Sequence, residues 1–139
     1  MTALEKMRNW LKEFPSWNRQ NLPVDYSDGI PEHCSLYCKG VEELSRKVDI
    51  LGNVVVVSRL RFALCRTADN SMDNLDNANW LVALQDWIRL QNGLGLSPDF
   101  GDVPKMEWIR AENGRMQDVL QAGTARYTVD ITVEFMNLY

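Results

Sequence analysis

Hydrophobic residues recur at helical spacing near the start of the chain. Residues 2–14 carry charged side chains on one side and an apolar stripe on the other, made of Leu4, Met7, Leu11 and Phe14. This three- and four-residue period predicts an amphipathic helix. Thr2, followed three residues later by Glu5, predicts a capping box at the start of the helix, and Pro15 ends it.

A second stretch with the same period follows a polar, turn-like segment at residues 69–76. Its apolar positions up to Asn92 are Leu75, Ala78, Leu81, Leu84 and Ile88, and two tryptophans, Trp80 and Trp87, widen the stripe. We therefore expect a second helix that is broad enough to cover a sheet. Gly93 is expected to supply a left-handed residue at its C-terminal end.

Strand-like patterns fill the stretch between the two helices. Residues 32–39 alternate with a period of two, and residues 41–50 and 53–67 are two further strand candidates. Leu51-Gly52-Asn53 separates the last two, and glycine tolerates the positive φ of a tight reversal. We expect a hairpin here, and its second strand, rich in β-branched residues, should be the longest and most central.

Three more strands are expected after the second helix. Residues 105–112 and 115–120 flank Asn113-Gly114, a pair typical of a tight hairpin turn because both residues tolerate positive φ. Residues 123–136 alternate cleanly, so one face of this last strand should be core. The six strands and two helices predict an α+β fold in one domain, residues 1–139. Its antiparallel sheet should carry both helices packed on one face.

Two loops complete this organisation. Residues 16–31 lack a period but carry Trp17 and Tyr26 as expected anchors. Residues 94–104 contain Gly95, Pro98, Gly101 and Pro104, with Phe100 in the middle. An exposed phenylalanine there would indicate contact with another molecule, so we expect this loop to be an interaction surface.

Composition narrows the class of protein. The 139 residues carry a net charge of −4, and no Lys/Arg run is longer than a pair, which disfavours tight DNA binding. The first residues lack the pattern of a signal peptide, and no apolar run approaches the ~20 residues that cross a bilayer. We expect a soluble protein made in the cytoplasm. The three cysteines suit reduced thiols better than a disulfide framework.

The residue types used in catalysis and metal binding are scattered. His33, the only histidine, lies beside Cys34 in a predicted strand, so the two side chains face opposite sides and do not form a metal site. We expect Cys34 and Cys38 to face the core as free thiols. No nucleophile motif accompanies His33, and Gly93 and Gly95 leave a helix instead of opening a phosphate loop. The sequence therefore predicts no catalytic, metal or cofactor site.

Several segments together resemble a known family. They are residues 7–11 (MRNWL), residues 24–26 (VDY), the long strand closing near Thr67, the helix at residues 79–87 (NWLVALQDW), the Gly/Pro loop and the ending at residues 125–133 (ARYTVDITV). Over nearly its whole length the chain is similar to the tail-terminator or minor capsid proteins of long-tailed phages and prophages of Gram-positive bacteria. These shared segments are packing patterns without a catalytic signature.

The resemblance implies a structural protein without enzymatic activity, assembled as a ring, commonly a hexamer. In the virion it would cap the tail tube and join it to the head, at the head–tail junction. The partners would be further copies of the chain, the tail-tube protein and head-connector proteins, with DNA passing through the ring without specific binding. Heterologous ring interfaces favour aromatic, arginine and loop residues. The candidates of this kind are Trp17, Tyr26, Arg59, Arg61, Leu94, Leu96, Asp99 and Phe100.

Three alternatives remain open at this point. A stopper or head-completion protein forms another ring at the same junction. An adaptor or regulatory binding module predicts a stable monomer or dimer. A small-molecule enzyme predicts a deep pocket with convergent polar groups near His33.

Overall fold

One antiparallel sheet and two helices make up the fold, as the sequence predicted. The computed structural model describes residues 2–15, 33–69, 74–121 and 124–139. The elements in chain order are α1 (Ala3–Leu11), β1 (His33–Val48), β2 (Val54–Asp69), α2 (Asn74–Gly93), the 3₁₀ helix η1 (Pro104–Met106), β3 (Trp108–Gln121) and β4 (Thr124–Leu138). The α+β class and the antiparallel sheet are therefore confirmed.

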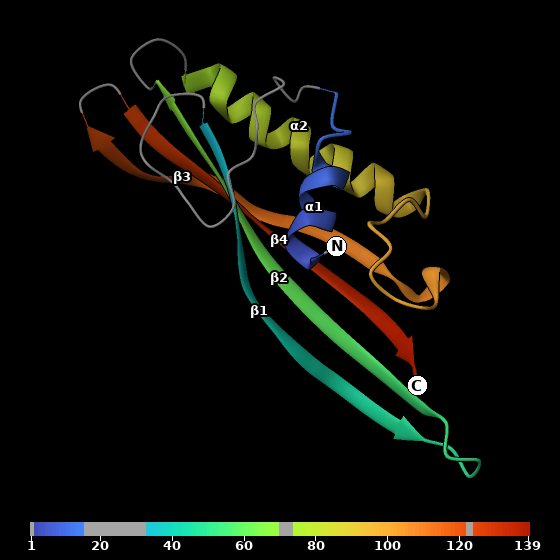
Figure 1. The fold of residues 1–139 in the computed structure, drawn as a ribbon. Helices are drawn as coiled ribbons and strands as arrows, with labels where there is room; N and C mark the ends of the chain where they lie inside the picture. The colour runs from blue at the N-terminus through green and yellow to red at the C-terminus, as the bar shows by residue number, and fades with distance from the viewer. Residues whose placement is uncertain (1, 16–32, 70–73, 122–123) are drawn as a thin grey trace.

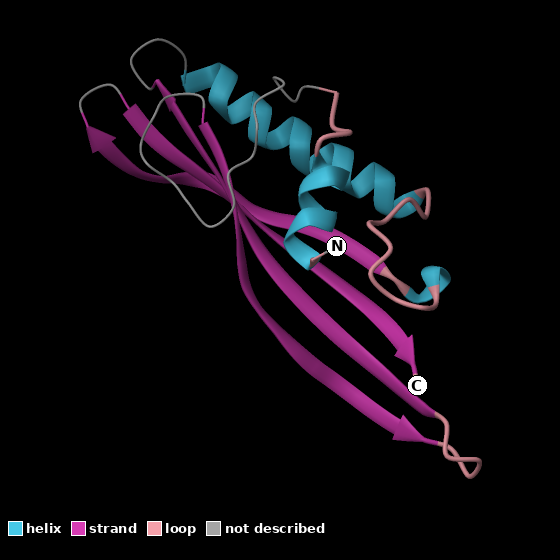
Figure 2. Cartoon of the chain, in the orientation of Figure 1, coloured by secondary structure: helices cyan, strands magenta, loops and turns pink. Residues whose placement is uncertain are grey.

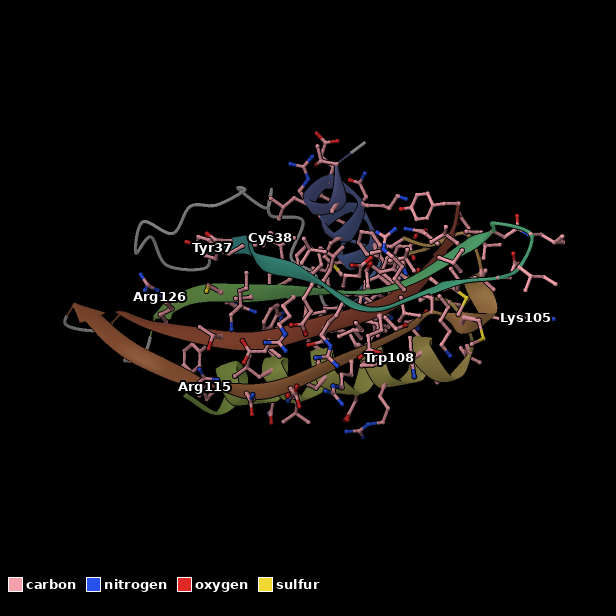
Figure 3. The ribbon with its side chains drawn as sticks, turned by 90° about the horizontal axis from the view of Figure 1, so that it is seen from below. Tyr37, Cys38, Lys105, Trp108, Arg115 and Arg126 are labelled. Carbon is pink, nitrogen blue, oxygen red and sulfur yellow. The ribbon has the colours of Figure 1, made fainter. Side chains whose placement is uncertain are left out.

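The sheet has the strand order β1-β2-β4-β3. The central strands, β2 and β4, pair in unbroken register from Val55–Leu138 to Asp69–Thr124. Both helices lie on one face of the sheet, and they cover only part of its length (Figures 1 and 3). The β1–β2 hairpin extends well past them, as Figure 2 shows.

The core lies between the helices and the covered part of the sheet. Alternate residues of β2 and β4 point into it, which confirms the predicted core face of the last strand. The helices meet through aromatic rings: Trp10 of α1 lies 4.8 Å from Trp87 of α2 between ring centroids, and Phe14 lies 5.5 Å from the same ring. The buried set includes Met7, Leu11, Leu36, Leu60, Phe62, Leu64, Leu84, Ile88, Tyr127, Val129, Ile131 and Val133.

The ends of both helices are shaped by local hydrogen bonds. The capping box at α1 is confirmed, because the side chains of Thr2 and Glu5 each accept the backbone N–H of the other residue. At the end of α2 the left-handed residue is Gly95 (φ +72°), whereas Gly93 is still helical. Leu96 donates its N–H to the Gln91 carbonyl at 2.9 Å, which closes a Schellman motif two residues later than predicted.

The described residues form four strands where the sequence predicted six. One strand, β1 (His33–Val48), takes in most of the two stretches predicted at residues 32–39 and 41–50, and it continues through Gly40 (φ +143°) with a bulge before it and another after it. The β1–β2 hairpin around Gly52 (φ +86°) is confirmed. Before β3, Pro104–Met106 form a 3₁₀ turn, so the strand expected from residue 105 begins only at Trp108.

The predicted hairpin turn at Asn113-Gly114 is wrong. Both residues lie inside β3, which pairs with β4 on either side of them: Glu112 opposes Asp130 and Arg115 opposes Thr128. Asn113 does adopt positive φ (+60°), but it forms a bulge. Gly114 donates its N–H to the side chain of Gln85 in α2, and a Cβ there would lie 3.0 Å from that side chain. Close helix packing thus explains this glycine.

The cysteines also differ from expectation. Cys65 is buried, but Cys38 is exposed, so the prediction of two core-facing thiols on β1 is wrong for Cys38. Its backbone opposes that of Phe62, which places it on the helix side of the sheet, beside the first turn of α1. Leu36, two residues earlier on the same face of the same strand, is fully buried. The side chain of Cys34 lies outside the described residues.

Candidate functional site

A hairpin arm that projects beyond the helices is the first unusual surface. We call residues 41–58 the arm. Its two strands are paired throughout, and β4 supports them from the side as far as Val54, which exchanges two backbone hydrogen bonds with Tyr139. The arm is therefore a braced extension of the sheet and not an isolated hairpin.

The far end of the arm presents bare apolar side chains. We call Ile50 and Leu51 the tip; their side chains are 100% and 82% exposed. Beside the tip, Val48, Leu138 and Tyr139 are also more than half exposed. Isolated exposed aliphatic residues are common, but a cluster at the end of a projection indicates a contact with another molecule.

A network of hydrogen bonds holds the tip in shape. The Asp49 carboxylate accepts N–H groups from Leu51 and Asn53, both at 2.9 Å, and the Asn53 side-chain amide at 3.0 Å. The side-chain bond from Asn53 is the main cause that lowers the pKa of Asp49 below its ordinary value of 3.8. The ionised carboxylate therefore fixes the turn that presents the tip.

The second surface is the face of the sheet opposite the helices. Near the base of the arm, Arg59 bridges two carboxylates: Glu42 on β1 at 2.9 Å and Glu134 on β4 at 2.8 Å. The hydrogen bond to Glu134 is the main cause that raises the pKa of Arg59 above its ordinary value. These pairs join three strands side by side on this face.

A second group of charges continues along the same face. Asp130 of β4 lies 3.4 Å from Lys39, and its other oxygen accepts the Asn113 amide at 3.3 Å. On β3, Arg110 lies 3.6 Å from Glu112 and stacks over the Trp108 ring at 5.1 Å. Cations and acids thus alternate across the strands.

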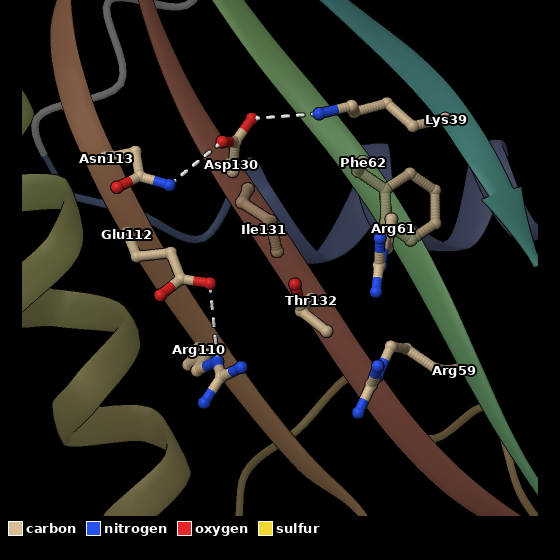
Figure 4. Close-up of a pocket in the computed structure, with 10 residues that line it drawn as sticks. All are labelled: Lys39, Arg59, Arg61, Phe62, Arg110, Glu112, Asn113, Asp130, Ile131 and Thr132. Carbon is tan, nitrogen blue, oxygen red and sulfur yellow. Dashed lines mark hydrogen bonds and ion pairs between the residues drawn. The ribbon is translucent and has the colours of Figure 1, made fainter. Parts of the chain in front are cut away.

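A groove of about 260 Å³ lies among the charged side chains of this face (Figure 4). Its walls include Lys39, Arg59, Arg61, Arg110, Glu112 and Asp130. Arg61 and Arg110 face it with side chains 53% and 57% exposed, and their ion pairs are the long ones, at 3.5 and 3.6 Å. Exposed guanidinium groups with weak internal partners suit the bidentate binding of carboxylates from another protein. The groove is charged and open, unlike the mostly apolar and enclosed pockets of small-molecule sites.

Part of the loop that is expected to make contacts packs against its own chain. Phe100 lies half-buried between Phe62 and Phe135, with ring centroids 6.1 and 5.7 Å away. Glu107 accepts three backbone N–H groups of this loop, from Asp99, Phe100 and Gly101, at 2.6–3.1 Å. Phe100 is thus packed against its own chain and is not an exposed side chain.

The remaining predicted interaction residues fall into separate groups. Arg59 and Arg61 lie together on the sheet face opposite the helices. Leu94 and Leu96 are exposed at the end of α2, away from that face, and the carbonyl oxygen of Asp99 accepts a hydrogen bond from Lys6. Trp17 and Tyr26 lie outside the described residues. Sequence reasoning missed the tip, although two aliphatic residues directly before the turn glycine were a visible signal.

Metal-ligating residue types are dispersed in the structure as they are in the sequence. Within the described ranges, no group of three or more His, Cys, Asp or Glu side chains is placed to hold a metal ion. The same part of the chain contains no helix with the length and apolar character needed to span a membrane. His33 belongs to β1, but its side chain lies outside the description.

Comparison with known proteins adds no identity. No protein-family model matches the chain, and no curated protein matches it. What remains to indicate a function is the pair of surfaces described above, together with the resemblance in sequence pattern.

Proposed function

We propose that the chain is a structural protein of a long-tailed phage or prophage, a tail terminator or minor capsid protein that acts as a ring at the head–tail junction. The observation that carries this proposal is the braced arm with its bare apolar tip. A tip whose two aliphatic side chains pack against nothing in the described part of the chain is accounted for by a contact with another chain. The resemblance in sequence supplies the phage context.

The shape of the subunit supports a ring in particular. The arm projects from one end of the sheet, so the surface it presents differs from the surface beside the helices (Figure 1). A contact between two different surfaces of identical subunits is heterologous, and repeated contacts of that kind close into a ring when the rotation permits. A hexamer is the ring size that the resemblance implies.

The sheet face opposite the helices is suited to contacts with the other junction proteins. Arg61 and Arg110 present exposed cations, whereas Arg59 is already held by two carboxylates. A face of paired charges attracts complementary protein surfaces and gives specificity. The same pairing, with the net charge of −4, leaves little affinity for the phosphates of passing DNA.

The test uses tail tubes assembled from the tube protein of the same phage. We expect the purified chain to bind the tube ends as a ring, visible by negative-stain electron microscopy, and to stop further tube growth. Binding to head connectors but not to tubes would replace the terminator role with a stopper role. Failure to bind either structure would contradict a junction protein.

A matched pair of variants tests the observation behind the proposal. Leu51→Asp places a charge at the tip, and we expect it to abolish ring formation on tube ends. Val82→Asp is the control, because Val82 is an exposed aliphatic residue on α2 that lies away from the arm. Equal assembly by both variants would show that the tip has no part in the function.

A further inference from the structure

An apolar groove lies beside the first turn of α1, and nothing in the junction role above assigns it. It has a volume of about 510 Å³, and its walls are Thr2, Ala3, Leu4, Glu5, Arg8 and the exposed Cys38 of β1. The surface inside it is mostly carbon. The groove is therefore an apolar environment, whereas the side chains of the tip are surrounded by water.

The tip cannot reach this groove in its own chain. Cys38 and Val48 belong to the same strand, and the segment between them extends roughly 30 Å at about 3.3 Å per residue. Pairing with β2 along this whole segment keeps it extended. A tip that fills such a groove therefore belongs to a second copy of the chain.

We propose that Ile50 and Leu51 of one copy insert into the α1 groove of the next copy. This inference rests on the ring proposed above and names the contact that closes it. Both halves of the contact are apolar and both lie on this chain, so each copy offers one tip and one groove. Such a contact is heterologous, and it leaves no unmatched tip in a closed ring.

Polar groups at the two surfaces complement each other as well. Arg8 is part of the groove wall and carries a positive charge. The tip brings the ionised Asp49 carboxylate, which has acceptor capacity left after its three bonds within the turn. An arginine facing a carboxylate at the edge of an apolar contact strengthens the contact and fixes its orientation.

A disulfide experiment tests the contact directly, because Cys38 lines the groove. We would make Leu51→Cys in a Cys34→Ser background, oxidise it with oxidised glutathione at high protein concentration and on tube ends, and run non-reducing gels. Each chain then carries one accessible thiol at the tip and one at the groove. We expect a ladder of linked chains beyond the dimer. Mass spectrometry should identify a peptide in which Cys38 is joined to the thiol introduced at position 51.

Two controls separate this contact from others. Adding Cys38→Ser should abolish the ladder, and Val82→Cys in place of Leu51→Cys should produce none. Dimers linked only between two introduced tip thiols would overturn the proposal in favour of a symmetric contact between two tips. A ring on tube ends without the link from the tip to Cys38 would overturn it while leaving the junction role intact. The ladder without tube binding would support the contact and contradict the junction role.

A mixing experiment checks the two sides independently. Ala3→Glu places a charge in the groove, yet an acid in the first turn favours the helix, so the variant should fold normally. We expect Ala3→Glu and Leu51→Asp each to weaken self-association about tenfold or more, as measured by analytical ultracentrifugation. Mixed together, they retain one intact tip and one intact groove, so we expect dimers and nothing larger. Unchanged association of either variant alone would overturn the proposal.

Discussion

The same strand builds two different regions of this molecule. On the helix side of β1, Leu36 is fully buried, whereas Val41, on the same side and farther along, is 67% exposed. Both positions are apolar and both point toward the face that carries the helices. The difference is that α1 and α2 cover the first region and end before the second (Figure 1). We call the first the packed region; the second is the arm.

This difference shows that alternation decides which face a side chain occupies but not what covers it. In the packed region the partner comes from the same chain, so burial stabilises the fold. In the arm Val56 is buried, but Ile50 and Leu51 at the tip stay exposed and gain little from folding alone. Binding to another chain would therefore remove the most exposed apolar surface from water at the tip of the arm.

Truncating one large side chain in each region should have the most unequal effects on stability. Phe62→Ala in the packed region should lower the free energy of unfolding by about 3–5 kcal/mol, because it leaves a cavity beneath Phe100. Leu51→Ala at the tip should change it by no more than about 0.5 kcal/mol. Chemical denaturation measures both. A large loss for Leu51→Ala would mean that the tip packs within its own chain.

A second variant tests whether the loop at residues 94–104 belongs to the packed region. Glu107→Ala removes the acceptor for three backbone N–H groups, so we expect a loss of about 2 kcal/mol in the same measurement. The control, Glu112→Ala, removes an exposed acid with one long ion pair and should cost less than about 0.5 kcal/mol. Equal effects would place the loop outside the stable core.

A smaller effect is expected where the arm leaves the packed region. Arg59→Met leaves Glu134 without the cation that holds it and Glu42 with only its longer pair to Arg61, so the melting temperature should fall. Arg110→Met on the same face removes only a weak pair and should have less effect. Salt screens surface charges, so the gap between the two variants should narrow at high ionic strength. A gap that does not respond to salt would exclude an electrostatic cause.

The smallest effect concerns the tip turn and depends on pH. The pKa of Asp49 is lowered in the folded chain, so its stabilisation of the turn is complete above 3.8 and is lost as the pH falls through the lowered value. NMR titration should show the amide signals of Leu51 and Asn53 moving with a midpoint below pH 3.8. Asp49→Asn should remove this titration. A midpoint at or above 3.8 would mean that the carboxylate does not hold the turn.

Local patterns were sufficient wherever a short stretch of chain decides its own structure. The alternation of β4 identified its buried residues, and Thr2 with Glu5 identified the start of α1. The hairpin at Gly52 followed from the single glycine between two strand patterns. Each of these features depends on neighbours within a few residues along the chain, which is why a sequence is enough to predict them.

The candidate surfaces were harder to predict, since they depend on what lies opposite each residue. Arg59 and Arg61 were identified as interaction candidates, but their carboxylate partners come from β1 and β4. Phe100 was a candidate contact residue, and only the approach of Phe62 and Phe135 shows that it packs within its own chain. The tip was overlooked because the sequence does not show where the helices end relative to the hairpin.

The two helices, the first hairpin and the core face of the last strand could be predicted from the sequence alone, because helical and strand periods are local properties. Only the tertiary structure decided that Asn113-Gly114 is a bulge, since β3 pairs with β4 on both sides and α2 presses against Gly114. It also decided that the helices stop short of the arm. Coverage is a relation between distant segments, and that relation leaves the Ile50-Leu51 tip bare.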